Sequence, residues 1–247
     1  MAKYIILDTE TTGASEKDRV IQLGYIVLGG AEVEVYNELC SAEVPIEIGA
    51  MEVHNITPDM IEGKPSCPEL PAYQRLEALN TPDNYMIIHN APFDLGMLKK
   101  EGFNSQMKLI DTLRVAKHLL PDSDYHRLQY LRYSLELYKT EKAEADKLGI
   151  ELKAHDALGD VLFLKMLLSK LRVLCKEKFP GENEVEKMVA LTATPVLITK
   201  PMRFGKHKGK TIQELAHSEA GYLDWMLKNM QNLDEDTKYT INLALGR

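Results

Sequence analysis

The sequence predicts an α/β fold in which a mixed β-sheet is flanked by helices and followed by a small C-terminal α+β module. Short apolar, β-branched runs such as residues 4–7 and 85–90 indicate buried strands. Helical segments lie between the later strands, which is typical of a sheet covered on both faces. The chain changes character near residues 192–199 and then becomes rich in glycine and lysine, so its last part is expected to be a separate unit.

Five strands are expected. The first three span residues 3–10, 19–28 and 31–40, and Gly29-Gly30 predicts a two-residue hairpin turn between the second and the third. These strands should form an antiparallel meander. The strands at 85–90 and 108–112 each run directly into a helix, which favours a mixed sheet.

Helices are expected between and after these strands. They span residues 67–79, 91–98, 113–120, 125–138 and 155–178. Pro121 ends the third. Residues 141–153 are strongly charged and are expected to be exposed to solvent. We therefore place one domain at residues 1–180, a linker at 181–199 and the C-terminal module at 200–247.

Composition indicates a globular protein. The chain has 247 residues, of which 45% are hydrophobic and 27% charged, enough for a sizeable core. No apolar run approaches the roughly 20 residues of a membrane span, and a strand follows the first residues directly, so neither a membrane partner nor a signal peptide is expected. Cys40, Cys67 and Cys175 lack metal-ligand spacing, which favours reduced thiols in a cytoplasmic protein.

Charge is distributed unevenly along the chain. The net charge of −7 argues against a general polyanion binder. Residues 196–247, however, hold eight Lys or Arg and six Asp or Glu, and the stretch 200–210 has five basic residues and no acidic one. A basic loop of this kind suits phosphate contacts, although a solvated charge run is the alternative. Lys206, Lys208 and Lys210 are the lysines of this loop that would contact phosphates.

Two carboxylates end the first strand. Asp8 and Glu10 are two residues apart, so their side chains lie on the same face of the strand. Adjacent carboxylates repel one another and are costly to bury unless a cation neutralises them. Oxygen ligands at this spacing suit Mg²⁺ or Mn²⁺. The alternative is an ordinary solvated turn.

Two further acidic residues extend this group. Asp94 follows the strand at 85–90, and functional groups of α/β sheets gather beyond the carboxyl ends of strands. Its alternative role is that of an acidic residue in a first helical turn. On a regular helix, His155 and Asp160 would lie about 140° apart. If His155 instead precedes the helix and Asp156 is the N-cap of that helix, His155 and Asp160 can both face the site. His155 would then accept a proton.

These motifs together resemble a known family. Residues 8–13, Asn90-x-x-Phe93-Asp94 and His155-x4-Asp160 are similar to the three exonuclease motifs of the DnaQ-like 3′→5′ exonucleases of the DEDDh class. Residues 53–57 and 111–113 resemble the secondary landmarks of that class. The stretches 203–210 and 221–226 resemble the C-terminal module of the exodeoxyribonuclease X family.

The resemblance implies a ribonuclease-H-like fold and the removal of nucleotides from DNA 3′ ends, in DNA repair or replication, with two Mg²⁺ ions for which Mn²⁺ can substitute. It implies four metal ligands: Asp8, Glu10, Asp94 and Asp160. His155 would deprotonate the attacking water. Five residues would line the pocket of the terminal nucleotide: Thr11, Thr12, His54, Asn90 and Phe93. Phe93 would either stack on a base or pack under the sheet edge.

The tail and the substrate leave alternatives open. Tyr222 or Trp225 could contact bases, but for Trp225 we favour a place in the core of the module. The expected partners are DNA with a free 3′ end and replication or repair proteins. A related exoribonuclease is one alternative, and a polymerase proofreading subunit whose tail binds a protein is another. An inactive binder is disfavoured, because all five motif residues are present.

Overall fold

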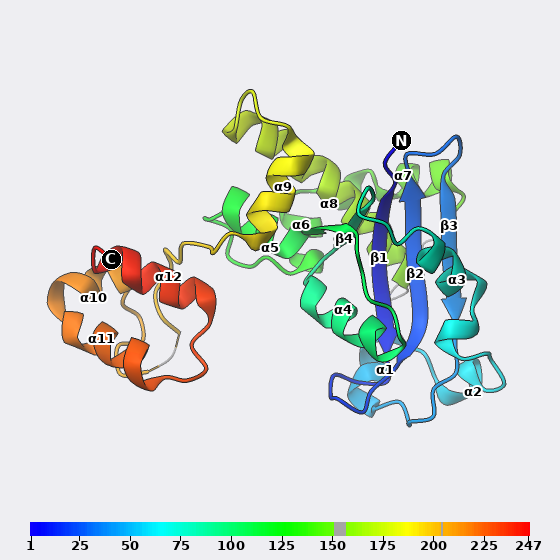
Figure 1. Ribbon diagram of the computed structural model, residues 1–247, viewed down its shortest axis with the longest axis horizontal. Coiled ribbons are helices and arrows are strands. Elements are labelled where there is room, and N and C mark those ends of the chain that lie inside the picture. The colour runs from blue at the N-terminus through cyan, green and yellow to red at the C-terminus, as the bar shows by residue number, and fades with distance from the viewer. Residues whose placement is uncertain (151–156, 204) are drawn as a thin grey trace.

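The computed structural model describes residues 1–150, 157–203 and 205–247, and a five-stranded sheet forms its centre (Figure 1). The strand order is β3-β2-β1-β4-β5. β1 pairs antiparallel with β2, and β2 with β3, whereas β4 and β5 run parallel to β1. This mixed sheet confirms the predicted fold class. The strands are β1 (Tyr4–Thr11), β2 (Val20–Leu28), β3 (Glu34–Leu39), β4 (Tyr85–Ile88) and β5 (Lys108–Asp111).

Helices cover both faces of the sheet and form the tail. Those of the body are α1 (Ile48–His54), α2 (Pro58–Ile61), η1 (Cys67–Glu69), α3 (Pro71–Ala78), α4 (Ala91–Lys100), α5 (Thr112–Leu119), α6 (Leu128–Ser134), η2 (Leu137–Lys139), α7 (Glu141–Leu148), α8 (Ala157–Lys178) and α9 (Glu184–Ala193). Those of the tail are α10 (Ile212–Ser218), α11 (Ala220–Asn229) and α12 (Glu235–Ala244).

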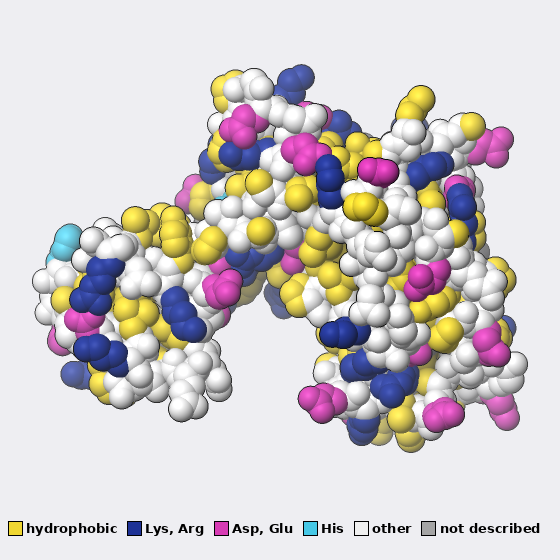
Figure 2. Space-filling view, viewed as in Figure 1, with side chains coloured by type: hydrophobic (Ala, Val, Ile, Leu, Met, Phe, Trp, Pro, Cys, Tyr) yellow, Lys and Arg dark blue, Asp and Glu magenta, His cyan; other side chains and the backbone are white. Residues whose placement is uncertain are grey.

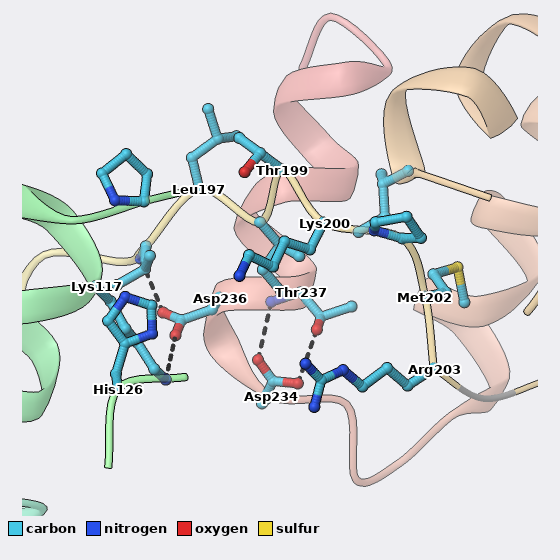
Figure 3. Close-up of a pocket in the computed structure, with 15 residues that line it drawn as sticks. Lys117, His126, Leu197, Thr199, Lys200, Met202, Arg203, Asp234, Asp236 and Thr237 are labelled. Carbon is cyan, nitrogen blue, oxygen red and sulfur yellow. Dashed lines mark hydrogen bonds and ion pairs between the residues drawn. The ribbon is translucent and has the colours of Figure 1, made fainter. Parts of the chain in front are cut away.

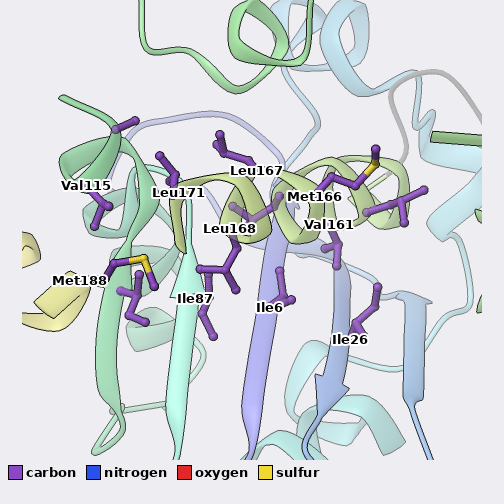
Figure 4. Packing of buried hydrophobic residues seen from close by; sticks show 14 of the residues in the cluster. Ile6, Ile26, Ile87, Val115, Val161, Met166, Leu167, Leu168, Leu171 and Met188 are labelled. Carbon is purple, nitrogen blue, oxygen red and sulfur yellow. The ribbon is translucent and has the colours of Figure 1, made fainter. Parts of the chain in front are cut away.

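Alternation along β1 divides the body into two hydrophobic cores. Ile6 packs with β4 and α8 on one face, while Ile5 and Leu7 pack with α3 and α4 on the other. All three side chains are fully buried, and each such burial stabilises the fold by roughly 1.5–3 kcal/mol. Figure 4 shows α8 lying across Ile6, Ile26 and Ile87 of the sheet. The central strand is therefore fixed from both sides.

The turn after β2 is longer than expected. β3 begins at Glu34, which pairs with Val27 of β2, so residues 29–33 form the connection rather than Gly29-Gly30 alone. The N-terminal segment lies close to the start of this turn. Gly29 has a φ of +91°, and a Cβ there would lie 2.5 Å from the carbonyl oxygen of Ala2. Only glycine fits this close approach, and the turn widens beyond it.

The expected helix over 125–138 is divided in the structure. α6 begins at Leu128, and Glu136 adopts a left-handed φ of 58° before the short helix η2. Residues 141–153, expected to be exposed, include α7, whose Ala145 is buried against α8. Glu144 of α7 also accepts a hydrogen bond from Lys165 of α8 at 2.9 Å. Charge composition alone did not reveal these contacts.

Residues 181–199, predicted as a linker, contain helix α9. Met188 of this helix is fully buried in the core that α5, α8 and β5 share. The segment without regular structure that leads to the tail therefore starts after Ala193. The domain boundaries themselves stay a prediction.

The tail has a small hydrophobic core of its own. Leu215, Leu223, Met226 and Ile241 are fully buried in it. The described residues of the tail hold three helices and no strand, but Met202 exchanges backbone hydrogen bonds with Gly209 and Lys210, both at 2.9 Å. The prediction of a small α+β module is therefore wrong for the described residues of the tail: the expected hairpin-like stretch is a closed loop, too short for a strand ladder, and three helices follow it instead of two.

An ion pair docks the tail on the body. Arg114 of α5 donates to both carboxylate oxygens of Asp236, at 2.8 Å each, and Lys117 lies 3.8 Å away. Asp236 also accepts the backbone N–H of Val196. Figure 3 shows Lys117 and Asp236 facing each other across the cavity between body and tail. Because Asp236 is buried, this contact fixes the position of α12.

Two smaller expectations concern the whole chain. Among the residues that the structure describes, none of the helices combines the length and the apolar composition that crossing a bilayer requires. The three cysteines are free and buried. These positions are consistent with the prediction of reduced thiols.

Candidate active site

The carboxyl end of β1 carries the first two acidic residues. Asp8 lies opposite Gly24 of β2, and Glu10 lies opposite Gln22. A Cβ on Gly24 would lie 3.0 Å from the Cβ of Ala157, so glycine is what allows the start of α8 to pack against β2. This close packing brings the first turn of α8 to the end of β1, where Asp8 and Glu10 lie.

Asp94 is fixed to the same strand by two hydrogen bonds. Its Oδ1 accepts the backbone N–H of Thr9 at 3.1 Å and the Thr9 hydroxyl at 2.7 Å. Helix α4, which carries Asp94, starts after Asn90, a residue with a left-handed φ of 71°. The buried carboxylate of Asp111, at the end of β5, accepts the N–H groups of Asn90 and Ala91 and so holds this turn.

Asp160, in the first turn of α8, is held by a side chain that the sequence did not indicate. Gln129 of α6 donates its amide to Asp160 at 2.6 Å. The amide oxygen of Gln129 accepts from Arg132, which makes two hydrogen bonds of 2.7 Å with Glu141. Thirty-one positions separate Gln129 from Asp160, and no spacing rule connects them.

The four carboxylates form one electrostatic site. Burial raises the pKa of Asp8 well above its usual value, and repulsion from Asp94, Asp160 and Glu10 raises it further. Burial raises the pKa of Asp94 to about 7, although its hydrogen bonds from Thr9 act in the opposite direction. Buried carboxylates that raise one another's pKa are stabilised by a nearby cation.

The donor set fits a hard divalent ion, since all four groups offer oxygen atoms. Within the described ranges, no three Asp, Glu, His or Cys side chains already stand in a metal-ligand arrangement. Carboxylates that repel one another do not converge further until a cation balances their charge. Repulsion from Asp94, Asp160 and Glu10 nevertheless raises the pKa of Asp8, so the four residues that the sequence motifs selected interact with one another.

Thr11, Thr12 and His54 were expected to line the substrate pocket. In the structure their side chains bond protein atoms and hold the turn after β1. Thr11 and Thr12 are buried, and their hydroxyls donate to the Gly13 carbonyl and to Asp18, both at 2.8 Å. The Nε2 of His54 bonds the Thr11 carbonyl at 3.1 Å, and its Nδ1 accepts a backbone N–H. Burial lowers the pKa of His54, so this ring is neutral at pH 7.

The other expected residues differ in position. Asn90 and Phe93 are exposed beside Asp94, and Phe93 is 36% exposed in the first turn of α4, which favours contact with substrate over packing under the sheet. Lys206, Lys208 and Lys210 are exposed on the tail and do not join the carboxylates. His155 lies outside the described residues.

Two family models match the chain. A model described as exonuclease matches residues 5–168, which include the four carboxylates and His155. A model described as exodeoxyribonuclease X-like C-terminal matches residues 202–231 of the tail. The two matches together cover both parts that the sequence motifs singled out.

Individual relatives agree with these models. The chain is 27% identical to exodeoxyribonuclease 10 of Escherichia coli (strain K12), over 96% of each chain. It is 26% identical to DNA polymerase III subunit epsilon of Pasteurella multocida (strain Pm70), over 91% of this chain and 88% of the relative. The structure of exonuclease X in complex with 5′ overhanging duplex DNA matches with a TM-score of 0.55 and 22% identity, covering 78% of this chain and all of the other.

Proposed function

The chain belongs to the exonuclease family whose model matches residues 5–168, and we propose that it is a metal-dependent 3′→5′ exodeoxyribonuclease acting in DNA repair or replication. The observation that carries the proposal is the group of carboxylates at the end of β1. There Asp94, Asp160 and Glu10 repel the ionised form of Asp8 and raise its pKa. The prediction of a DnaQ-like exonuclease is confirmed at the level of the family.

Divalent metal ions are a general requirement of exonucleases of this family, and Mg²⁺ is the ion that we propose here. We assign Asp8, Glu10, Asp94 and Asp160 as the ligands of two ions, and Mn²⁺ is expected to substitute. When bound, such ions neutralise the scissile phosphate and lower the pKa of the attacking water.

The side chains of the protein divide the remaining work. We propose that His155 accepts the proton of the attacking water. Thr9 orients Asp94 through its hydroxyl and its N–H, and Gln129 orients Asp160. Phe93 is exposed next to Asp94 and would stack on the terminal base or wedge beside it. Asn90 lies at the same turn and offers an amide to the terminal nucleotide.

The strand-end turn supports this arrangement indirectly. His54 holds the carbonyl of Thr11, and Thr12 holds Asp18, so the backbone beyond Glu10 has a fixed course. We propose that Thr11, Thr12 and His54 shape the pocket of the terminal nucleotide through this backbone. Their side-chain groups already bond protein atoms, so direct contacts to substrate would come from the neighbouring main chain.

DNA is the proposed substrate because the relative that matches over nearly its whole length is named as an exodeoxyribonuclease. The match between the tail and the exodeoxyribonuclease X-like C-terminal model supports the same choice. Lys206, Lys208 and Lys210 are exposed on this tail, where they can contact phosphates. The similarity to a polymerase epsilon subunit supports a second candidate, a proofreading subunit whose tail binds a replication protein.

A matched nuclease assay tests the proposal. Purified protein would be given single-stranded DNA and RNA of the same sequence with Mg²⁺, and with EDTA as control. We expect mononucleotides to leave the DNA from its 3′ end only when Mg²⁺ is present, and the Asp8→Asn variant to release none. Release from RNA alone would keep the site and overturn the substrate. No release from either would overturn the enzyme assignment.

A further inference from the structure

An exposed aromatic stack lies beside the basic loop of the tail. Trp225 is the single tryptophan of the chain and is 51% exposed on α11. Its ring stacks on Tyr222, with the ring centres 5.8 Å apart and the planes 21° from parallel. The sequence favoured a core position for Trp225, but Leu223 and Met226 occupy the core and Trp225 points outward.

His207 anchors the other side of this stack. Its ring meets Tyr222 edge-on, with the ring centres 4.5 Å apart. His207 is 7% exposed, and its Nε2 is the one buried side-chain N or O atom among the described residues that makes no hydrogen bond. The stack therefore joins a buried histidine of the basic loop to an exposed indole on α11.

The basic loop, whose described residues are 202, 203 and 205–210, lies close to the stack. A Cβ on Gly205, which has a φ of +77°, would lie 2.9 Å from the Tyr222 hydroxyl. Glycine is thus required here for both conformation and space. Lys206 and Lys208 are the sequence neighbours of His207 and are exposed to solvent, so the loop that holds the buried end of the stack also carries two cations.

The same loop also faces the body. Lys208 and Arg203 line a cavity of about 550 Å³ together with Tyr125 of the segment before α6. The guanidinium of Arg203 lies 5.4 Å from the centre of the Tyr125 ring. We use the term catalytic edge for the end of β1 and the four carboxylates proposed as metal ligands there. Four residues after Tyr125, Gln129 contacts Asp160, so at most about 14 Å of extended chain separates the cavity wall from this edge.

Figure 2 shows Lys and Arg side chains spread over the visible face of the tail and in the hollow between tail and body. Acidic residues are fewer near the loop itself, where Asp124 lines the same cavity. A nucleic-acid strand that leaves the catalytic edge would therefore meet cations before it reaches the stack. Exposed rings next to cations are the combination that binds single strands without regard to sequence.

We propose that Trp225 and Tyr222 form a platform on which an unpaired base of the substrate strand stacks, while Lys206 and Lys208 bind the adjoining phosphates. This inference rests on the proposed exonuclease function and extends it to a second contact on the tail. The platform lies outside the catalytic pocket, so it contributes to affinity for longer strands and not to the cleavage step.

The single tryptophan reports directly on this platform. The full-length chain would be titrated with single-stranded DNA of about 15 nucleotides in EDTA, so that no strand is cleaved, while tryptophan emission and the anisotropy of labelled DNA are followed together. We expect emission to be quenched with the same Kd that anisotropy gives. Binding without any change of emission, or no binding by the chain, would overturn the platform.

Substitutions separate stacking from general attraction. Trp225→Ala is expected to raise the Kd roughly 5- to 150-fold, the usual range for loss of one stacked base, and Trp225→Phe to raise it less. Tyr239→Ala, which removes another exposed aromatic ring of the tail on α12, is the matched control and should leave the Kd unchanged. Equal Kd values for the native chain and Trp225→Ala would overturn the proposal.

The outcome is distinguishable from that of the nuclease assay. If Mg²⁺ supports release of nucleotides while DNA leaves the emission of Trp225 unchanged, the exonuclease stands and the platform falls. If emission is quenched but no nucleotide is released, the platform stands and the proposed function falls. The enzyme and the platform therefore have separate readouts.

Discussion

The catalytic edge and the basic loop of the tail carry opposite charges in opposite physical settings. At the end of β1, carboxylates are crowded together and held by hydrogen bonds from Thr9 and Gln129. On the loop of residues 202–210, lysine side chains are exposed to water. The crowded carboxylates cost folding free energy until a cation binds. The exposed lysines cost little, and salt weakens their attraction to phosphates. Chemistry and affinity are therefore expected to respond to different perturbations.

The largest expected effect comes from removing charge at the catalytic edge. Asp8→Asn should lower the rate of DNA hydrolysis by at least about 10³-fold, since the variant would lack a proposed metal ligand and its charge. The same change should stabilise the metal-free fold, because burial and repulsion from neighbouring carboxylates raise the pKa of Asp8 and so disfavour its ionised form in the folded state. Thermal unfolding in EDTA at neutral pH measures this gain.

A loss of stability in that variant would contradict the electrostatic description of the site. The matched control is Asp83→Asn, which neutralises an exposed carboxylate in the turn before β4 and should change neither hydrolysis nor stability. Comparing the two variants separates the crowding at the sheet edge from the general effect of the net charge.

The next effect tests whether hydrogen bonds position the carboxylates. Gln129→Leu keeps the size of the side chain but removes the 2.6 Å hydrogen bond to Asp160. Removing such an outer partner is expected to weaken metal affinity about 10- to 100-fold. Calorimetric titration with Mn²⁺ measures this affinity without relying on activity. Gln74→Leu, at an exposed position of α3, is the control, and equal affinities in both variants would remove Gln129 from this role.

Gln129 also shows where sequence reasoning stops. The strands, the carboxylates of β1 and Asp94 were predictable, because alternation along a strand and the position after a strand are local properties of the chain. The contact of Gln129 with Asp160 depends on the course of residues 120–127, which breaks the expected helix and starts α6 at Leu128. Local periodicity carries no information about that course.

Trp225 illustrates a second limit. Four apolar residues within one helical turn and a half, at positions 222, 223, 225 and 226, cannot all face a small core. The structure buries Leu223 and Met226, three residues apart, and leaves Trp225 outside. Hydrophobicity alone does not rank these residues, and only the packing of α10 and α12 against α11 distinguishes them.

The basic loop should respond to salt rather than to metal. Replacing Lys206, Lys208 and Lys210 by alanine is expected to weaken DNA binding and to reduce the slope of log K against log salt by about 2, since each phosphate that a lysine neutralises on a single strand adds roughly 0.7 to that slope. Anisotropy at several salt concentrations measures the slope. Alanine at Lys64, Lys170 and Lys176, three exposed lysines of the body, should leave it unchanged. An unaltered slope in the tail variant would exclude binding of phosphates by these lysines.

The smallest expected effect is on stability and comes from His89, which precedes Asn90 at the start of α4. Its Nε2 donates to the His126 carbonyl at 2.9 Å, so Nδ1 is left to accept from Thr112. Burial lowers the pKa of His89 from 6.5 to about 4, so its contribution to stability is complete above pH 6.5 and is lost as the pH falls toward 4. That contribution is at most about 3 kcal/mol.

His89→Gln should flatten the dependence of unfolding free energy on pH in this window, measured by urea unfolding. His217→Gln, at an exposed position of α10, should leave the dependence as it is in the native chain, and a similar flattening there would mean that burial of His89 is not its cause.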